Sequence, residues 1–246
     1  MRKQLFSVTA ALLVLLSMTA MASTGRYDRQ IQQTVSRKIQ ASTKLQNVSS
    51  SVDDGIVTLT GTVGLYQEKL DAAKKVRKLE NVAGVRNDIA VAGGTIPDGQ
   101  LQQKLAKQLA YDRVGYYDNT FNYLALDVKD GVVTLSGDTV NEVAKDSALA
   151  MVARTPGVKD VVSEVKELPV SNFDDSIRVR TARAIYRDSV LGRYAVDPVH
   201  PIRIVVNHGH VTLYGSVENT MDKTLAGMRA NAVPGAFSVE NRLTVE

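Results

Sequence analysis

The chain has 246 residues and a formal net charge of +4, with 30 lysines and arginines against 26 acidic residues. Two of the positive charges, Arg2 and Lys3, lie in a predicted leader, so the rest of the chain is close to neutral and is not expected to bind nucleic acid. The sequence has no cysteine, which excludes disulfides, thiol catalysis and a lipid-modified N-terminal cysteine.

Residues 1–22 have the three zones of a secretory signal peptide. Arg2 and Lys3 form the charged start, an apolar run is centred on residues 10–16, and small residues at 20–22 predict cleavage after Ala22. A retained N-terminal anchor is the alternative, but the apolar run is shorter than the roughly 20 residues that span a bilayer. We therefore expect the chain to be exported and cleaved.

The elements that follow the leader are a helix, a hairpin, a second helix and a third strand. Ile31, Val35 and Ile39 recur at four-residue steps, which predicts a helix with one apolar face. An Asp-Gly pair ending at Gly55 predicts a tight hairpin turn, because glycine tolerates the positive φ that such turns need. The predicted elements are a helix over 28–42, strands over 48–52 and 56–63, a helix over 66–78 and a strand over 85–91.

A seven-residue phrase in this hairpin, Gly-Ile-Val-Thr-Leu-Thr-Gly from Gly55, returns twice along the chain. It reads Gly-Val-Val-Thr-Leu-Ser-Gly from Gly131 and Gly-His-Val-Thr-Leu-Tyr-Gly from Gly209, a spacing longer than that of solenoid repeats. We interpret its valine and leucine as core residues and its glycines as turn and bend positions, with a further glycine after the second helix. These structural positions are Gly55, Val57, Leu59, Gly61 and Gly84; Gly131, Val133, Leu135, Gly137 and Gly157; and Gly209, Val211, Leu213, Gly215 and Gly235.

Three copies of the phrase predict three copies of one small domain. A strand–helix–strand crossover makes its two strands parallel, whereas the hairpin is antiparallel. Each unit should therefore be a mixed three-stranded sheet with both helices on one face, an α+β fold of αββαβ order. The predicted organisation is a signal peptide at 1–22 and domains at 23–94, 95–170 and 171–246.

The second unit carries an aromatic-rich loop over residues 111–123, between its first helix and its first strand. Tyr116, Tyr117 and Phe121 are candidates for insertion at a membrane interface, where an apolar ring with a polar tip is favoured. The alternative is that these rings pack beneath their own sheet and complete a small core.

The third unit carries the densest run of arginines. In its first helix, which Asp174 is predicted to cap, Arg180, Arg183 and Arg187 follow at i, i+3 and i+7, with Arg178 nearby. These four arginines are candidates for binding the headgroup phosphates of anionic phospholipids. The alternative is a solvated helix face whose arginines pair with neighbouring aspartates.

A hairpin with this phrase, an amphipathic helix of about four turns and a Pro-Gly-Val or Ala-Gly-Val step resemble the BON domain, named for bacterial osmotically inducible and nodulation proteins. The resemblance covers nearly all of the chain after the leader. Unit one departs from it by a longer spacing between Gly61 and Gly84, and unit three by Ala236 in place of a valine.

The resemblance implies the αββαβ fold, residence in the periplasm or at the outer membrane, and a non-enzymatic role without a cofactor. It also implies binding to phospholipid surfaces and support of envelope integrity under stress such as osmotic shock. An alternative is a scaffold that self-associates or docks on envelope proteins, as similar folds do in secretion-channel rings. A hydrolase would need a catalytic set that the sequence lacks, and His208 and His210 alone are too few ligands to predict a metal.

Overall fold

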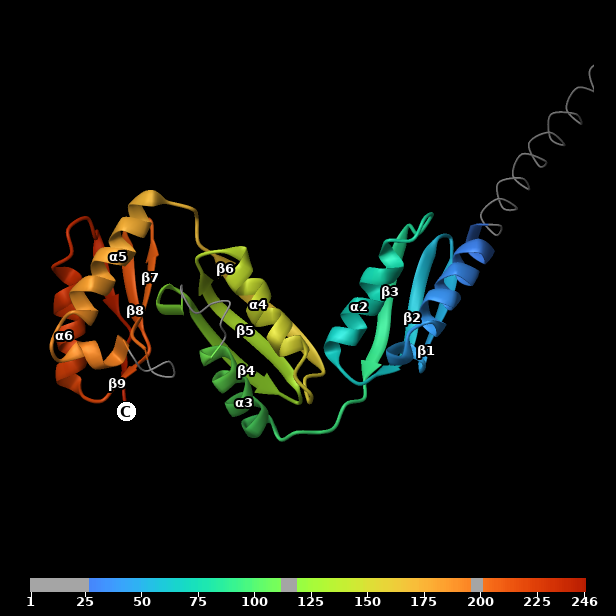
Figure 1. Cartoon of the computed structure of the whole chain (residues 1–246), viewed down its shortest axis with the longest axis horizontal. Helices are drawn as coiled ribbons and strands as arrows, with labels where there is room; N and C mark the ends of the chain where they lie inside the picture. Colours follow the sequence, from blue (N-terminus) through green and yellow to red (C-terminus); the bar gives the residue numbers. More distant parts are fainter. Residues whose placement is uncertain (1–26, 112–118, 196–200) are drawn as a thin grey trace, which may run out of the picture. The chain divides into compact units, whose positions relative to one another are not determined.

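The computed structural model describes residues 27–111, 119–195 and 201–246 (Figure 1). Its contacts divide the chain into two compact parts, one ending at Gly94 and one running from Thr95 to Glu246. The second part contains two of the three repeats, which are called units one, two and three in chain order. The predicted signal peptide, residues 1–22, and the loop tyrosines Tyr116 and Tyr117 lie outside the described residues. Within the described residues, no helix is both long enough and apolar enough to cross a bilayer.

The first repeat has the predicted order of elements. A helix over residues 27–40 buries Ile31, Val35 and Ile39 on one face, as their four-residue spacing predicts. A short 3-10 helix then leads into the hairpin. The further elements are η1 (Thr43–Leu45), β1 (Val48–Asp53), β2 (Ile56–Val63), α2 (Tyr66–Arg77) and β3 (Gly84–Val91).

The second and third repeats follow the same order. The second consists of α3 (Asp98–Ala110), η2 (Asn119–Phe121), β4 (Tyr123–Lys129), β5 (Val132–Thr139), α4 (Glu142–Ala153) and β6 (Asp160–Glu167). The third consists of α5 (Asn172–Tyr186), η3 (Leu191–Ala195), β7 (Arg203–Asn207), β8 (His210–Tyr214), β9 (Ser216–Val217), α6 (Thr220–Asn231), β10 (Ser238–Asn241) and β11 (Thr244–Val245). In this third repeat the central and last strands are each interrupted, and β9 pairs with β11.

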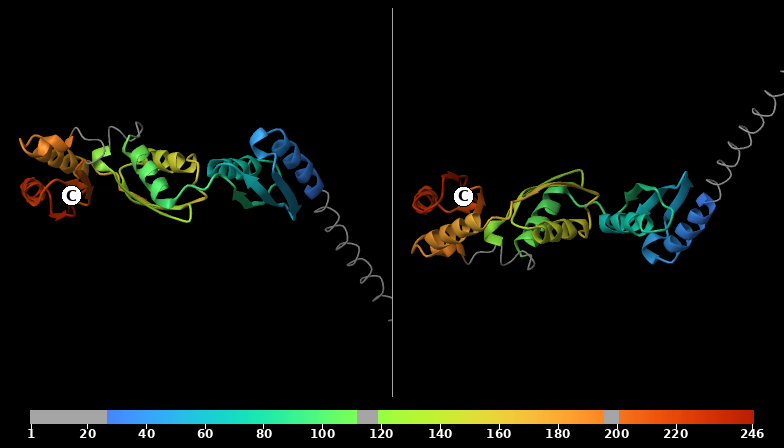
Figure 2. Two further views of the ribbon diagram at one scale, coloured as in Figure 1. Left: turned by 90° about the horizontal axis from the view of Figure 1, so that it is seen from below. Right: turned by 90° about the horizontal axis from the view of Figure 1, so that it is seen from above.

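Each repeat forms a mixed three-stranded sheet, and the predicted α+β fold is confirmed. The strand orders are β1-β2-β3, β4-β5-β6 and β7-β8-β10. The hairpin strands pair antiparallel and the strand after the second helix pairs parallel; Val57, for example, lies opposite Val52 on one side and Val85 on the other. Figure 2 shows the helices gathered on one side of each sheet.

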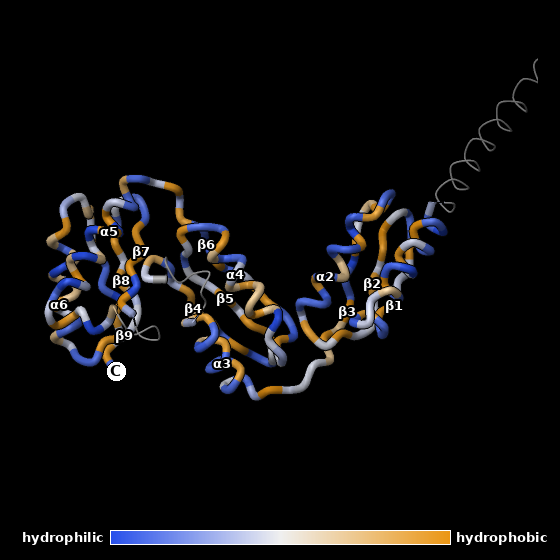
Figure 3. Tube along the Cα trace, in the orientation of Figure 1, coloured by the Kyte–Doolittle hydropathy of each residue, from blue (hydrophilic) through white to orange (hydrophobic). Residues whose placement is uncertain are grey.

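The repeated phrase builds the core of each unit. Its valine and leucine are fully or almost fully buried at Val57, Leu59, Val133 and Leu135, and at their counterparts in β8. The intervening threonines are only half-buried. Figure 3 shows this interleaving of apolar and polar residues along the strands. The period-two pattern of a strand with one covered face accounts for it.

The second glycine of the phrase permits a close approach between backbones. A Cβ at Gly61 would lie 2.0 Å from the carbonyl oxygen of Asn47, and one at Gly137 would lie 2.0 Å from that of Tyr123. The φ angles, 111° and 121°, belong to the region that favours glycine. No side chain fits at these positions, which explains the glycine at this point of the phrase.

A carboxylate from the first helix of each unit holds the hairpin turn. Asp28 accepts hydrogen bonds from the amides of Asp54 and Gly55 at 3.1 and 2.9 Å, and Asp98 accepts from Asp130 and Gly131 at 2.7 and 3.0 Å. Asp174 does the same for His208 and Gly209, at 2.9 and 2.8 Å. Both turn residues have positive φ in all three hairpins, as in a type I′ turn.

This arrangement corrects the predicted role of Asp174. The residue does not cap α5; Ser171 is the N-cap, and its side chain accepts a hydrogen bond from the amide of Asp174. The carboxylate of Asp174, 1% exposed, faces the hairpin instead. A capping carboxylate and a turn-binding carboxylate look alike in sequence, because both sit in the first turn of a helix.

The close approach at Gly137 predicts a strongly destabilised variant. Gly137→Ala should lower the free energy of unfolding of this unit by about 3 kcal/mol or more, because both the φ angle and the backbone contact oppose a Cβ. Gly99→Ala in α3 is the matched control, since no atom lies within 4 Å of its added Cβ. Thermal unfolding by circular dichroism measures both; equal melting temperatures would contradict the account.

Candidate functional site on the α5–α6 face

The helix α5 has a capped start and carries the predicted arginines. Ser171 caps its start, and Asp174 and Asp175 lie in its first turn, where negative charge is favoured by the helix dipole. Ile177, Thr181 and Ile185 face the sheet and are fully buried. The side of α5 turned away from these residues is open to solvent.

Arg178 is not on the solvent side, contrary to the prediction. Its side chain is 4% exposed, donates to the carboxylate of Asp175, and donates through Nη2 to the carbonyl oxygen of Val206 at 2.6 Å. It thus ties α5 to β7. Arg178 is therefore no candidate for headgroup binding, because these bonds hold its guanidinium against the sheet.

Arg180, Arg183 and Arg187 do lie on the outer side of α5. Arg183 and Arg187 are exposed, and Arg180 is half-buried, with its Nε donating to the carbonyl oxygen of Ser176 at 3.0 Å. Among the described residues, no carboxylate forms an ion pair with these three arginines. Their positive charge is therefore available to an anion.

Arg180 and Arg187 line one groove with residues of the second helix. This groove, of about 470 Å³, lies between α5 and the C-terminal end of α6, and Arg229 of α6 contributes a third guanidinium to it. Asp188 is its acidic member. That carboxylate is engaged by Arg229, whose Nε and Nη2 lie 2.8 and 2.7 Å from Oδ2. The groove keeps a cationic excess through Arg180 and Arg187.

Two exposed phenylalanines adjoin the arginines. Phe173 of α5 and Phe237, before β10, are 46% and 68% exposed, and their ring centroids are 5.6 Å apart. The turn at Gly209 supports Phe237, since a Cβ there would lie 2.6 Å from its ring. Phe173 also shares one helix side with Arg180 and Arg187, because the three follow at seven-residue steps. Together they combine aromatic rings with cations, as at membrane interfaces.

Of the aromatic candidates of the second repeat, the structure describes Phe121. Its ring packs against the core of the third repeat. Next to it, the rings of Tyr123 in β4 and Tyr214 in β8 stack with centroids 3.8 Å apart. Phe121 therefore joins the second and third repeats instead of facing a membrane. The other two candidates, Tyr116 and Tyr117, lie outside the described residues.

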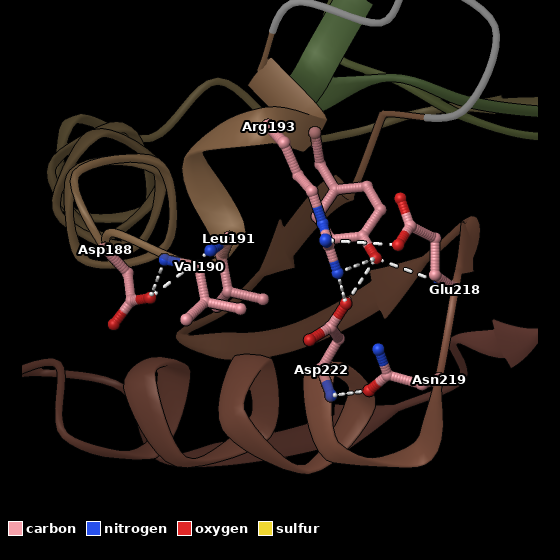
Figure 4. Close-up of polar contacts among 8 residues, drawn as sticks. Asp188, Val190, Leu191, Arg193, Glu218, Asn219 and Asp222 are labelled. Carbon is pink, nitrogen blue, oxygen red and sulfur yellow. Dashed lines mark hydrogen bonds and ion pairs between the residues drawn. The ribbon is translucent and has the colours of Figure 1, made fainter.

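A buried carboxylate holds η3 against α6 (Figure 4). Asp222, 2% exposed, accepts from Arg193 and, at 2.6 Å, from the hydroxyl of Tyr194. The amide of Asp222 donates to the side chain of Asn219, which caps α6. Burial by itself would raise the pKa of this carboxyl, but the bonds from Tyr194 and Arg193 outweigh it and lower the pKa.

Asp188 fixes the residues that lead from α5 into η3. Its Oδ1 accepts from the amides of Val190 and Leu191 at 2.9 and 3.2 Å. The Val190 amide is the main cause that lowers the pKa of this carboxyl, and Arg229 and the Leu191 amide add to it against a smaller effect of burial. Asp188 and Asp222 thus hold the two ends of the segment around η3 through hydrogen bonds.

The described residues contain one group of three carboxylates close enough to share a cation. Oxygen atoms of Asp28, Asp53 and Asp54 lie within 4.8 Å of one another. Asp28 already accepts two hairpin amides, which explains the group without an ion. His210, one of the two histidines considered above, has its Nδ1 2.7 Å from the hydroxyl of Ser238.

Sequence reasoning found the arginines but missed Phe173, Phe237 and Arg229. Phe173 carries a signal that could have been read, because it continues the seven-residue steps of Arg180 and Arg187 toward the helix start. Phe237 and Arg229 belong to elements that meet α5 only in the folded unit. No local pattern links them to it.

Comparison with known proteins agrees with the fold. The structure is a tandem array of small αββαβ domains, which defines the class of protein. The family model described as "BON domain" matches three times, over residues 27–93, 97–169 and 178–246. The chain therefore belongs to the BON domain family, as its hairpin phrase predicts.

One curated relative is Osmotically-inducible protein Y of Escherichia coli strain K12. It is 28% identical over 134 residues, which cover 50% of this chain and 63% of the relative. The match thus spans less than two thirds of the relative's length.

One similar solved structure is that of CdsD, a structural protein of the type III secretion system of Chlamydia trachomatis. It is 14% identical, the match covers 86% of this chain and 90% of that chain, and the TM-score is 0.24. The PrgH periplasmic domain is 9% identical, with 82% and 96% covered and a TM-score of 0.19. Likenesses at this level do not bear on function.

The Asp222 network predicts an acid-sensitive third unit. A carboxyl whose folded pKa is lowered stabilises the fold above its unfolded pKa of about 3.9, and this contribution is lost as the pH falls through the folded pKa. Asp222→Asn should therefore destabilise the protein by about 1 to 3 kcal/mol at pH 7 and by less at pH 3. Urea unfolding at both pH values measures this.

The control for this variant is Asp146→Asn, the same change at an exposed position of α4 in unit two. It should leave the urea midpoint unchanged at both pH values. A loss of stability in Asp222→Asn that is equally large at pH 7 and at pH 3 would contradict the ionic account.

Proposed function

We propose that the chain is a non-enzymatic envelope protein that acts in the periplasm and binds anionic phospholipid surfaces through the α5–α6 face. In this role it supports envelope integrity under stress such as osmotic shock. The observation that carries the proposal is the set of Arg180, Arg183 and Arg187 on α5, which form no ion pair with another described residue, beside the exposed pair Phe173 and Phe237. Membership of the BON family and the name of the osmotically inducible relative support the stress-related role.

The geometry suits a surface rather than a small soluble anion. Arginine forks pair with phosphate oxygens in two parallel hydrogen bonds, so Arg180, Arg183 and Arg187 can each engage a headgroup. Each basic residue near an anionic leaflet contributes about 1 kcal/mol of binding free energy. Phe173 and Phe237 add apolar area that can enter the boundary between headgroups and acyl chains.

The scaffold alternative has one observation in its favour. Phe121 and the stacked rings of Tyr123 and Tyr214 join the second repeat to the third, so one BON unit of this chain does present a surface that another unit covers. A scaffold predicts an oligomer that is indifferent to lipid, whereas a lipid-binding module predicts a chain that binds anionic vesicles. Light scattering after size exclusion, combined with vesicle sedimentation, separates the two.

Charge reversal on α5 tests the lipid proposal. The triple variant Arg180→Glu, Arg183→Glu and Arg187→Glu should bind vesicles of phosphatidylcholine with phosphatidylglycerol at least about tenfold more weakly, since three favourable contributions are lost. Wild-type binding should also fall in 0.5 M salt, where screening is stronger. Co-sedimentation with the vesicles measures both effects.

The matched control reverses the same number of charges on the first unit. Lys74, Lys75 and Arg77 are exposed on α2, and their change to glutamate alters the net charge equally. This control should bind within about twofold of the wild-type chain if the α5 face is the site. Equal losses in both triple variants would show that net charge alone sets binding, and unchanged binding in the α5 variant would refute the proposal.

A further inference from the structure

Two methionine side chains lie on the outer side of α6, exposed to solvent. Met221 and Met228 are 78% and 63% exposed. They are seven residues apart, so they lie about two turns apart on the same side of the helix. The opposite side packs into the core of unit three through Ala226 and Ala230, which are fully buried. Neither thioether is therefore needed to fill that core.

An oxidant that donates an oxygen atom finds few other sulfur atoms in this chain. The sequence has no cysteine, whose thiolate is the sulfur group that such oxidants usually attack in proteins. It has six methionines, of which Met151, Met221 and Met228 follow the predicted leader. Met151 of α4 is half-buried. The two thioethers of α6 are thus the most accessible sulfur atoms of these three.

The reaction at each sulfur is a two-electron oxidation. With hydrogen peroxide as the oxidant, the lone pair of the thioether sulfur attacks one oxygen atom, an S–O bond forms and the O–O bond breaks. The leaving hydroxide takes the proton of the attacked oxygen, so the sulfur becomes a sulfoxide and the peroxide is reduced to water. A sulfoxide is polar, and methionine sulfoxide reductases convert it back to the thioether.

Met228 lies at the border of the α5–α6 face. It precedes Ala232 by four residues, so the two side chains are neighbours along one side of α6. Ala232 lines the groove that also contains Arg180 and Arg187. Met228 therefore places apolar surface next to the cations, and Met221 continues this surface toward the start of the helix. Oxidation replaces this apolar surface by polar sulfoxides.

We propose that Met221 and Met228 form a reversible oxidation site, at which a peroxide converts both thioethers to sulfoxides while unit three stays folded. Oxidation makes the outer side of α6 polar and weakens the attachment of the α5–α6 face to a membrane, a consequence that rests on the proposed function. Oxidants thereby release the third unit from the membrane, and reduction of the sulfoxides restores its attachment.

Peptide mass spectrometry after timed exposure to hydrogen peroxide tests the oxidation site. In the folded chain, Met221 and Met228 should each gain one oxygen atom at least about threefold faster than Met151, because their sulfur atoms are more exposed. In urea the rates should become equal, since unfolding exposes all three. Methionine sulfoxide reductases of both stereospecificities should restore the original mass.

The variant Met151→Leu shows whether oxidation on α6 leaves the fold intact, because after the leader it keeps only the two methionines of α6. Its melting temperature should be the same before and after peroxide treatment. Oxidation of Met151 in the wild-type chain at a rate equal to that of Met221 and Met228 would overturn the oxidation site. A fall in the melting temperature of oxidised Met151→Leu would also overturn it.

Vesicle sedimentation tests the consequence for membrane attachment. The oxidised chain should bind vesicles of phosphatidylcholine with phosphatidylglycerol at least about threefold more weakly than the untreated chain, since apolar surface beside the cations is lost. The double variant Met221→Leu, Met228→Leu keeps the apolar surface without the sulfur atoms, so peroxide should leave its binding unchanged. Met151→Leu is the matched control and should show the full effect of peroxide.

The outcomes separate this inference from the proposed function. Equal vesicle binding by the oxidised and untreated chains, or an equal loss in the double leucine variant, would overturn the effect of oxidation on attachment. A chain that fails to bind vesicles before any oxidation would instead refute the proposed function. The mass measurements would then still decide whether Met221 and Met228 are the oxidation site.

Discussion

The bond between a helix carboxylate and two hairpin amides is the constraint on which all three units depend. Asp28, Asp98 and Asp174 each occupy the first turn of their helix, three residues before the first buried residue of its apolar stripe. Each satisfies two turn amides, and hydrogen bonds to charged groups contribute about 1.5 to 3 kcal/mol apiece. The carboxylate thereby fixes the first helix relative to the sheet, and this fixes the direction in which the outer side of that helix faces.

With the scaffold held in this way, the three units can differ elsewhere. The third residue of the second helix is an acid in α2 and α6, where it pairs with Lys44 and Arg193, and an alanine in α4. On its first helix, the third unit carries Arg180, Arg183 and Arg187, which form no ion pair with another described residue. We attribute function to these variable places, and stability to the repeated glycines, the core residues and the carboxylate.

Much of this fold follows from the sequence, because the features that specify it are local and repeated. The alternation in Val57 and Leu59, the Asp-Gly turn and the four-residue steps of Ile31, Val35 and Ile39 each report the backbone of their own element. The role of Asp174 was predicted wrongly because its partners, the amides of His208 and Gly209, are distant in sequence. A pattern within α5 does not reveal which groups face it.

The candidate site was predictable only in part, for the same reason. Arg178 and Arg180 are two residues apart, yet one binds Val206 against the sheet and the other borders a groove. The pairing of Phe173 with Phe237 and the contribution of Arg229 exist only once α5 and α6 have packed together. Phe121 lies in a loop whose aromatic residues predict membrane contact. In the structure, however, its ring packs against the core of the third repeat.

Residue-resolved amide NMR of the chain with bicelles containing phosphatidylglycerol tests the central claim, that one variable face on an unchanged scaffold meets the membrane. The account predicts that chemical-shift changes concentrate on α5, the C-terminal half of α6 and the segment around Gly235 and Phe237. The hairpin turns at Gly55 and Gly131 should keep their shifts. Changes of similar size on the first helices of all three units, or changes confined to the first unit, would contradict it.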